Sequence, residues 1–380
     1  MPNYSLKKYS TGNILLLLVI FLSFFSINCF YINPVYVFSF LFYFIFVMKI
    51  CNILKIKKQI LFLFLFLLSF LILQLFTLYY SNFKIKNYLS IFLFFHSMLM
   101  GLLTIFIFNN ISIISRVKVY SNIYKILLIF LFVEFFTRFI FIANIKNNFY
   151  DYKNSLMYYD SNFTGLVILN FLYFYIYLNK RKIYKLSNFK FLLLWMFLFL
   201  TFSRAAFLAA IISYFIFFNI KKFRFRAIFC FFTFFIILLI MLMFYLNGNS
   251  YVEVDGSFNS KFYIIAKGLD VYFNEFDTIN KLFGIGIGNF KNISGIFAHN
   301  IFITFLLEFG LFGTLFLLIV AIYFIKNTNY FCLFIFLPNF IVGFSLFSAY
   351  SPFIFVLTAC IFMEENEKRL LDEKNIIRYS

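Results

Sequence analysis

Long apolar runs separated by short polar breaks fill most of this chain of 380 residues. Several runs reach the roughly 20 residues that an α-helix needs to cross the hydrocarbon core of a bilayer. They are continuously apolar rather than alternating, which favours helices over the strands of a β-barrel. The pattern therefore predicts an all-α fold, a polytopic bundle of about twelve membrane helices. These are expected near residues 13–33, 35–50, 59–80, 88–108, 126–145, 162–178, 189–203, 205–220, 227–246, 299–325, 330–348 and 350–363.

One polar segment is much longer than the other breaks. Residues 247–298 separate a first block of expected helices, in residues 1–246, from a last block in residues 299–363. The segment mixes charged and apolar residues, so part of it can lie on the membrane surface as an amphipathic helix. It is too short for an independent domain. A charged tail, residues 364–380, follows the last expected helix.

The composition is that of a membrane protein. Hydrophobic residues make up 64% of the chain, 69 residues are Phe, and only 12% are charged. A soluble domain usually has about a quarter of its residues charged. The composition therefore excludes a cytosolic enzyme, a secreted disulfide scaffold and a nucleic-acid-binding domain, in spite of a formal net charge of +19.

The distribution of basic residues predicts the orientation in the membrane. If both termini are cytoplasmic, most of the 33 Lys and Arg residues fall in the inner connections and at the two ends of the chain. Those inner connections contain no Asp or Glu. Because cytoplasmic connections of membrane proteins carry an excess of Lys and Arg, we expect cytoplasmic termini and a long loop on the outer face. The net charge reports topology, and no nucleic-acid partner is expected.

The sequence contains no pattern typical of a metal or acyl-enzyme site. The five Cys residues are scattered, without a Cys-x-x-Cys pair, and we expect them to be small buried residues. The two His residues, His96 and His299, are far apart, and the acids of the long loop lack ligand spacing. There is also neither a Ser-His-Asp order nor a Gly-x-Ser-x-Gly turn. We therefore expect no metal.

Ionisable residues inside expected spans need a physical reason, because a charge in hydrocarbon is costly. His96 stands alone in an apolar run, and we expect a hydrogen-bonded core residue rather than a ligand. Glu134 and Arg138 are four residues apart, so they share one helix face and can neutralise each other. An internal ion pair and a role in substrate binding both fit this spacing.

Two candidate functional residues lie at the expected outer boundary of the membrane. Arg204 follows Thr201-Phe202-Ser203 between two short helices, where a guanidinium can bind phosphate through two hydrogen bonds. A membrane anchor is the alternative. His299 begins an expected span, and an imidazole with an ordinary pKa of about 6.5 can act as a general base near neutral pH. An interfacial histidine without a catalytic role is the alternative there.

Glycine residues flank His299 along the sequence. The run Phe283 to Phe290 has alternate glycines but lacks the flanking elements of a dinucleotide-binding fingerprint. On a regular helix starting at His299, Gly310 and Gly313 lie within roughly 40° of the histidine face, and Glu308 points to the opposite side. Small residues let a neighbouring helix approach closely, so we expect this stripe to hold the imidazole rigidly.

Four motifs, in this order, resemble those of the O-antigen polymerase and O-antigen ligase superfamily of bacterial membrane glycosyltransferases. They are Asp160-Ser161-Asn162-Phe163-Thr164, Thr201-Phe202-Ser203-Arg204, the glycine-rich segment Gly284–Phe290, and His299-Asn300 followed by Gly310 and Gly313. The resemblance covers roughly residues 150–325. Ser260-Lys261 departs from the family, whose members usually carry Ser-Arg there, and a lysine lacks the two-point phosphate contact of a guanidinium.

The resemblance implies an enzyme of the bacterial inner membrane that works at the periplasmic face on glycans linked to polyprenyl pyrophosphate, without nucleotide, metal or other cofactor. It implies that His299 takes the proton of the acceptor hydroxyl and that Arg204 stabilises the departing pyrophosphate. A helix N-cap is the alternative role for Asp160 and Asn162. The residues expected to assist in substrate binding are Lys261, Arg138, Asp160, Asn162 and Asn300.

Three functions remain open at this stage. A polymerase joins repeat units of O-antigen or another surface polysaccharide while they are still on the lipid carrier. The motifs do not separate it from a ligase, but the opening Asp160 to Gly165 and the compact outer loop resemble those of polymerases more closely. A ligase moves the finished glycan to lipid A-core. A flippase or transporter of lipid-linked oligosaccharide is a different class, but transporters usually place polar groups near the bilayer midplane. The expected partners are the lipid-linked oligosaccharide, the bilayer and, as accessory proteins, a chain-length regulator and a flippase.

Overall fold

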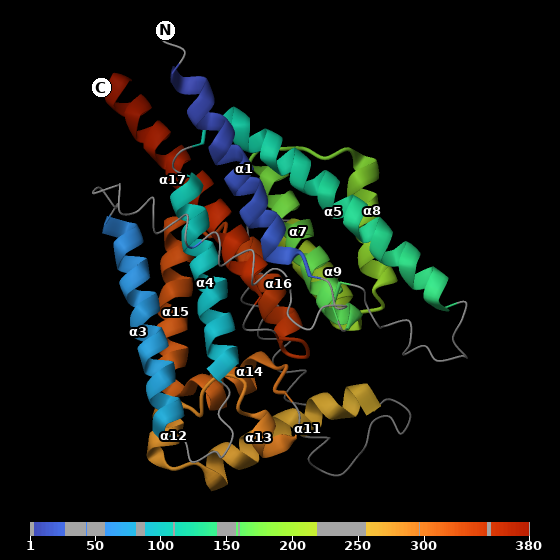
Figure 1. The fold of residues 1–380 in the computed structure, drawn as a ribbon, viewed down its shortest axis with the longest axis vertical. Helices are drawn as coiled ribbons and strands as arrows, with labels where there is room; N and C mark the ends of the chain where they lie inside the picture. Colours follow the sequence, from blue (N-terminus) through green and yellow to red (C-terminus); the bar gives the residue numbers. More distant parts are fainter. Residues whose placement is uncertain are drawn as a thin grey trace.

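In the computed structural model the chain is all-helical over the residues that the structure describes (Figure 1). These are residues 4–26, 43, 58–80, 88–108, 111–142, 157–158, 160–218, 256–295, 297–347 and 351–379. The longer helices are α1 (Tyr4–Phe24), α3 (Lys58–Tyr80), α4 (Tyr88–Phe108), α5 (Ile113–Ile142), α7 (Ser161–Lys180), α15 (Gly310–Asn327) and α17 (Pro352–Tyr379). The shorter ones are α8 (Asn188–Leu200), α9 (Arg204–Phe218), α11 (Gly256–Asp270), α12 (Thr278–Phe283), α13 (Lys291–Ser294), α14 (Ile301–Ile303) and α16 (Leu333–Gly343).

Five helical segments are long and apolar enough to cross a membrane. They are Leu61–Tyr80, Tyr88–Phe108, Ile113–Arg138, Ser161–Lys180 and Ile301–Asn327. Shorter apolar helices cover Gly12–Phe24, Asn188–Leu200, Arg204–Phe217 and Leu333–Gly343. The all-α prediction is confirmed for the described residues, whereas a total of twelve spans stays a prediction. Of the remaining expected helices, 227–246 lies outside the described residues, as does 35–50 apart from Tyr43.

Three boundaries differ from those expected. Helix α5 begins at Ile113, well before residue 126, and α17 continues through the segment 364–380 that was expected as a separate tail. The stretch 299–325 is not one regular helix, because the short α14 leads into a π-helical segment, η3 (Thr304–Phe309), before α15 begins. The expected helical stripe that joins His299 to the later glycines is therefore wrong.

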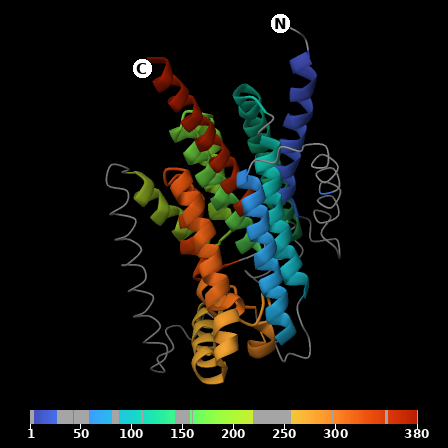
Figure 2. The same cartoon turned by 90° about the vertical axis from the view of Figure 1, so that its left-hand side faces the viewer.

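The long helices run side by side between two ends of the molecule, as Figure 2 shows. Helix α1 begins and α17 ends at one end, and α11 to α14 form a layer at the opposite end (Figure 1). Helix α4 packs along α17 and also against α1 and α3, while α7 packs against α8, α9 and α16. The long loop and the two ends of the chain thus lie at opposite ends of the helical body.

Close packing and paired polar groups hold the helices together. A Cβ atom at Gly101 of α4 would lie 3.0 Å from the Cβ atom of Phe355, so the glycine permits the approach of α17. Asn170 of α7 and Asn339 of α16 exchange two amide hydrogen bonds, of 3.1 and 2.5 Å. Each amide is thereby satisfied in an apolar interior, where an unpaired polar group would be costly.

A cluster of charged residues joins α5, α7 and α17 near the end where the chain begins and ends. Its members are Arg116, Arg181, Glu364, Glu365 and Glu367, and we call it the terminal-end charge cluster. Arg116 Nε lies 3.3 Å from Glu364 Oε1, and Arg181 Nε donates a hydrogen bond of 2.6 Å to Glu365. The acids that follow the last apolar run therefore lie beside basic residues from two other connections, which explains why α17 continues through them.

Candidate functional site

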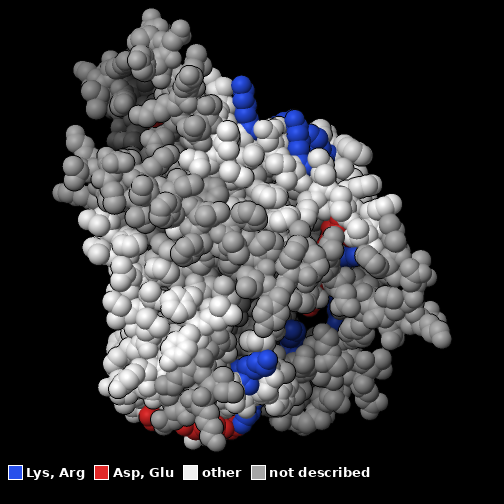
Figure 3. Space-filling view, viewed as in Figure 1, with Lys and Arg blue, Asp and Glu red and all other residues white. Residues whose placement is uncertain are grey.

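Most of the predicted site residues lie at the end of the molecule opposite to the terminal-end charge cluster. The first turns of α7 and α9, helix α11 and the segment leading into α14 approach one another there (Figure 1). Figure 3 shows Lys and Arg atoms beside a hollow in the lower half of this face. The site is thus assembled from segments that are far apart in the sequence.

His299 lies in the loop before α14 and not inside a helix. Its φ angle is +40°, in the left-handed region that side chains other than glycine rarely adopt. Its carbonyl oxygen accepts a hydrogen bond of 2.9 Å from the backbone N–H of Phe347. The imidazole contacts the rings of Phe163 and Phe297, with centroids 5.9 and 5.7 Å away. Aromatic neighbours and the backbone thus fix the half-buried imidazole, rather than the expected glycine stripe.

Asn300 has a structural role as the N-cap of α14. Its Oδ1 atom accepts hydrogen bonds from the N–H groups of Phe302 and Ile303, at 2.9 and 3.2 Å. Its Nδ2 atom donates to the carbonyl oxygen of Phe344 at 2.6 Å. The buried amide therefore ties α14 to the end of α16, and this arrangement favours positioning of the neighbouring His299 over direct substrate contact.

The glycine-rich segment packs directly against the backbone of η3. The N–H of Ile285 donates to the carbonyl of Leu307 at 2.9 Å, and that of Gly286 donates to the carbonyl of Glu308, also at 2.9 Å. A Cβ atom at Gly284 would lie 2.5 Å from the carbonyl oxygen of Glu308, and one at Gly310 would lie 2.3 Å from the nitrogen of Gly284. These two glycines, both with positive φ, allow the two segments to touch.

Gly313 and Glu308 make different contacts. Gly313 faces α3, because a Cβ atom there would lie 3.4 Å from Gln74 Nε2, so it serves helix packing as expected. The Glu308 side chain accepts a hydrogen bond of 3.2 Å from the N–H of Phe290. The buried carboxylate therefore closes the glycine-rich segment. The expected placement of Glu308 away from the glycines assumed a regular helix, which the π-helical segment interrupts.

Asp160 and Asn162 form the N-cap of α7. Asp160 Oδ1 accepts from the Asn162 N–H at 2.9 Å, and Asp160 Oδ2 accepts from Asn162 Nδ2 at 2.8 Å. This is the capping arrangement that the sequence left open beside a role in binding sugar. Because Phe163 of the same turn contacts the imidazole, the cap also brings the Asp160 carboxylate into the electrostatic surroundings of His299.

Arg204 is the exposed first residue of α9. The turn before it packs closely on α7, since a Cβ atom at Gly165 would lie 3.0 Å from Ser203 Cβ and 3.1 Å from Thr201 Oγ1. Phe202 in this turn has a φ of +51°. The turn therefore places Arg204 beside the first turns of α7, the helix whose N-cap lies near His299. This position suits a residue that binds an anion.

Two other ionisable residues have partners within the protein. Arg138 Nη2 lies 2.6 Å from Glu134 Oε1, and Glu134 Oε2 accepts from the N–H of Met157 at 2.9 Å. The internal ion pair, one of the two arrangements that the sequence left open, is thus the one observed. His96 Nδ1 lies 2.7 Å from the hydroxyl of Tyr43, which confirms a hydrogen-bonded core histidine.

Burial and charge together set the protonation of His299. Burial lowers the pKa of His299 below its ordinary value, and the positive charge of Lys261 on α11 lowers this pKa further. The carboxylate of Asp160 and a hydrogen bond to the backbone of Phe347 act in the opposite direction. The imidazole is therefore neutral at neutral pH, the form that can accept a proton.

Sequence reasoning missed the aromatic surroundings of this imidazole. Phe163 and Phe297 come from different segments, and in a chain with 69 Phe residues neither stands out. Among the described residues no group of three His, Cys, Asp or Glu side chains lies close enough to hold a metal ion. No protein-family model matches this chain, and no curated protein matches it either.

Proposed function

We propose that the protein is a membrane glycosyltransferase that polymerises repeat units of O-antigen or another surface polysaccharide, each carried on polyprenyl pyrophosphate. The observation that supports it best is the arrangement around His299. A neutral, half-buried imidazole lies near the cation of Lys261 and the carboxylate of Asp160, which come from different parts of the chain. The motif resemblance implies a role in the reaction for the same three residues.

These residues suit the chemistry of glycan transfer. His299 takes the proton of the acceptor hydroxyl as its oxygen attacks the anomeric carbon of the donor. The bond between that carbon and the pyrophosphate oxygen breaks, and the pyrophosphate leaves with both bonding electrons. Lys261 and Arg204 stabilise its negative charge. Asn300 and the glycine-rich segment act indirectly, because they fix the backbone on either side of the histidine.

The arrangement of charges along the molecule supports a site on the outer face of the membrane. The basic connections that carry Arg116 and Arg181 lie beside α17, whereas His299 lies at the other end of the helical body. With the basic end in the cytoplasm, as the positive-inside rule favours, His299 faces the periplasm of the bacterial inner membrane. A flippase and a chain-length regulator are the accessory proteins that such a polymerase requires.

A gel profile of surface glycan from a host that lacks the gene tests the proposal. Complementation with wild type restores a ladder of chain lengths, and complementation with His299→Ala leaves core plus a single repeat unit. The matched control is His96→Gln, which changes the other histidine of the chain and should retain the ladder. Immunoblots of membrane fractions establish that all variants are inserted in equal amounts.

Two other outcomes assign other functions. Bare core together with accumulated lipid-linked long chains would indicate the ligase that transfers finished glycan to lipid A-core. An unchanged ladder in the host without the gene would contradict the proposal, and purified protein in vesicles would then be tested for movement of lipid-linked oligosaccharide.

A further inference from the structure

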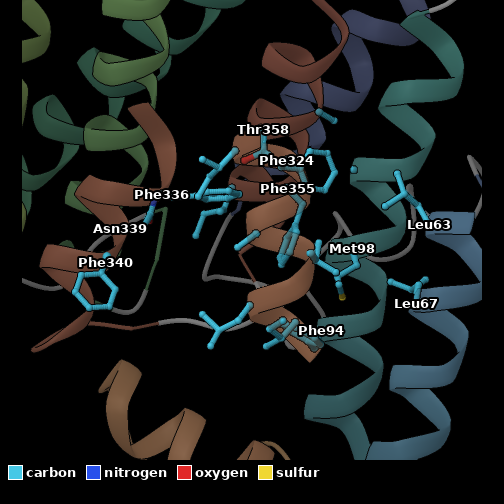
Figure 4. A pocket seen from close by; sticks show the side chains of 18 of the residues that line it. Leu63, Leu67, Phe94, Met98, Phe324, Phe336, Asn339, Phe340, Phe355 and Thr358 are labelled. Atoms are coloured by element: carbon cyan, nitrogen blue, oxygen red, sulfur yellow. The ribbon is translucent and has the colours of Figure 1, made fainter. Parts of the chain in front are cut away.

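A large apolar cavity lies between α3, α4, α15, α16 and α17, at some depth in the helical body (Figure 4). Its volume is about 460 Å³. Residues from all five helices line it, among them Leu67, Met98, Phe324, Phe336, Phe355 and Thr358. A cavity of this size accommodates a ligand as large as a typical small-molecule drug or a comparable length of lipid chain.

The chemistry of the lining excludes a charged or sugar-like occupant. No Lys, Arg, Asp or Glu is among the described residues that line the cavity. Two of its polar residues are already engaged: Asn339 pairs with Asn170, and the hydroxyl of Thr314 donates to the carbonyl of Phe305 at 2.7 Å. An apolar chain gains free energy from such a site, whereas a polar head group would lose its hydration without compensation.

The cavity extends from the surroundings of His299. Phe347 lines it, and the N–H of Phe347 donates to the carbonyl of His299. A second cavity of about 220 Å³ shares Ile301 and Phe340 with the first and continues to Tyr272, in the layer that contains α11. Apolar space therefore runs from the proposed catalytic end into the helical body.

The cavity also reaches the outer surface of α15. Leu318 lines it and is 45% exposed. Its neighbours Leu315 and Ile319 are exposed apolar residues of the same helix, as expected for a surface that faces lipid. The cavity wall thus borders the lipid-facing surface of α15.

We propose that this cavity binds the part of the polyprenyl chain nearest to the pyrophosphate of the lipid-linked substrate. The inference rests on the proposed function, which places that pyrophosphate beside His299. A chain attached there must run from a polar site into apolar surroundings, and the two adjacent cavities, which share lining residues, lie along that path. The occupant is therefore the isoprenoid chain of the substrate.

Thr358 supports an isoprenoid over a saturated acyl chain. Its side chain lies on the cavity wall together with Phe324 and Phe355 (Figure 4), is 2% exposed, and its Oγ1 atom has no hydrogen-bond partner among the described residues. A buried hydroxyl without an acceptor is unfavourable. The double bond of each isoprene unit can accept a weak hydrogen bond from it, as aromatic π systems do, and a saturated chain cannot.

Lipid binding to the purified full-length protein, measured by native mass spectrometry, tests the proposal. The probes are undecaprenyl phosphate and dipalmitoyl phosphatidic acid, which present a phosphate on different chains. Val320→Phe places a ring in the cavity, and the control Ile319→Phe places the same ring on the adjacent exposed position outside the lining. We expect wild type and control to prefer undecaprenyl phosphate, and Val320→Phe to bind it about tenfold more weakly, as for the loss of about two buried methylene groups.

Two results would overturn the assignment. One is undecaprenyl phosphate binding that is equal in Val320→Phe and Ile319→Phe. The other is equal binding of both lipids to wild type, which would indicate a general lipid site. The isosteric variant Thr358→Val should reduce the preference for the unsaturated chain while unfolding at the same temperature as wild type, and an unchanged preference contradicts the role of the hydroxyl.

The binding assay separates this inference from the proposed function. If lipid selectivity depends on the cavity but His299→Ala retains a full glycan ladder, the cavity assignment stands and the polymerase proposal fails. If the ladder depends on His299 but Val320→Phe binds the lipid normally, the polymerase proposal stands and the cavity assignment fails.

Discussion

At the scale of single residues, two charges of opposite sign act on one imidazole. Lys261 lowers the pKa of His299, and Asp160 raises it. Because only the neutral imidazole can accept the proton of a hydroxyl, the activity should fall when the pH drops through this pKa. The lowered pKa keeps the base active at pH values below its ordinary value of about 6.5.

Removing either charge should move the pH profile, in opposite directions. Lys261→Gln deletes a positive charge, so the pKa of His299 rises and the acidic limb of the profile moves to higher pH. Asp160→Asn deletes a negative charge and moves the limb to lower pH, while asparagine still caps α7. The measurement is glycan transfer by purified protein in vesicles between pH 5 and 8, the range in which an imidazole titrates.

A second lysine of α11 provides the control for this experiment. Lys267 pairs with Asp270 and Glu275 on the exposed side of the helix, at 3.3 and 3.1 Å. Lys267→Gln should leave the pH profile in place. If Lys261→Gln and Asp160→Asn moved the acidic limb in the same direction, the pH profile would not report the pKa of His299.

The sequence predicted the candidate residues better than their roles. His299 was identified from its type and position, and Lys261 and Asp160 from the motif resemblance; the structure places the two charges where they act on the imidazole. Asn300 was expected to bind substrate, yet all its described hydrogen bonds are to backbone groups. A motif specifies a residue type, but an amide can cap a helix or bind a sugar equally well, and only tertiary contacts distinguish these roles.

At the scale of elements, the contact between the glycine-rich segment and η3 was unpredictable from helical periodicity. The sequence indicated Gly310 as a helix-packing position, but a period of 3.6 residues does not allow for a π-helical segment. The extra residue per turn in η3 and the positive φ of Gly310 rotate the faces of α15 away from the positions that a regular helix would give.

Substitution of two glycines separates backbone strain from steric exclusion. Gly284 and Gly295 both have a positive φ, of +79° and +77°. Alanine at Gly295 meets nothing within 4 Å, so its effect should be limited to strain of roughly 1–2 kcal/mol. Alanine at Gly284 adds a contact of 2.5 Å with the carbonyl of Glu308 and should destabilise the protein more.

Thermal unfolding of the purified variants in detergent measures this difference. Gly284→Ala should unfold at a clearly lower temperature than Gly295→Ala, and it should also lose glycan transfer because the segment before His299 is displaced. Equal unfolding temperatures for the two variants would show that the segment does not pack on η3 in solution.

At the scale of the whole molecule, the terminal-end charge cluster joins three helices, and one of them, α7, carries the Asp160 cap of the proposed site at its other end. Arg181 of α7 is held by Glu365 of α17, whose side chain is 3% exposed. Removing one partner of a buried pair leaves an uncompensated charge, and costs about 3–5 kcal/mol in soluble proteins. Glu365→Gln and Arg181→Gln should each lower the unfolding temperature.

The double variant tests whether the two residues act as a pair. Because it leaves no uncompensated charge, Arg181→Gln with Glu365→Gln should be less destabilised than the sum of the single changes. The exposed pair of Lys267 and Glu275 is the control and should show no measurable coupling. Additive effects at Arg181 and Glu365 would contradict the pairing.

The charge cluster also bears on the topology of the whole chain, which the distribution of basic residues predicts. Arg116, Arg181 and the acids of α17 meet at one end, as expected if all three segments lie on the same side of the membrane. The sequence could predict that these segments share one side of the membrane, because the positive-inside rule depends only on charge counts. It could not predict which acid pairs with which base, because that depends on how α5, α7 and α17 pack.

Single cysteine substitutions at the two ends of the molecule test the orientation. Thr278 is exposed at the start of α12, and Asn188 is exposed at the start of α8, at the opposite end. With cytoplasmic termini, a membrane-impermeant maleimide should label Thr278→Cys in spheroplasts, whereas Asn188→Cys should be labelled only after permeabilisation. The reverse pattern would place His299 in the cytoplasm, out of reach of periplasmic glycans. The wild-type chain, labelled in parallel, gives the contribution of its five native cysteines.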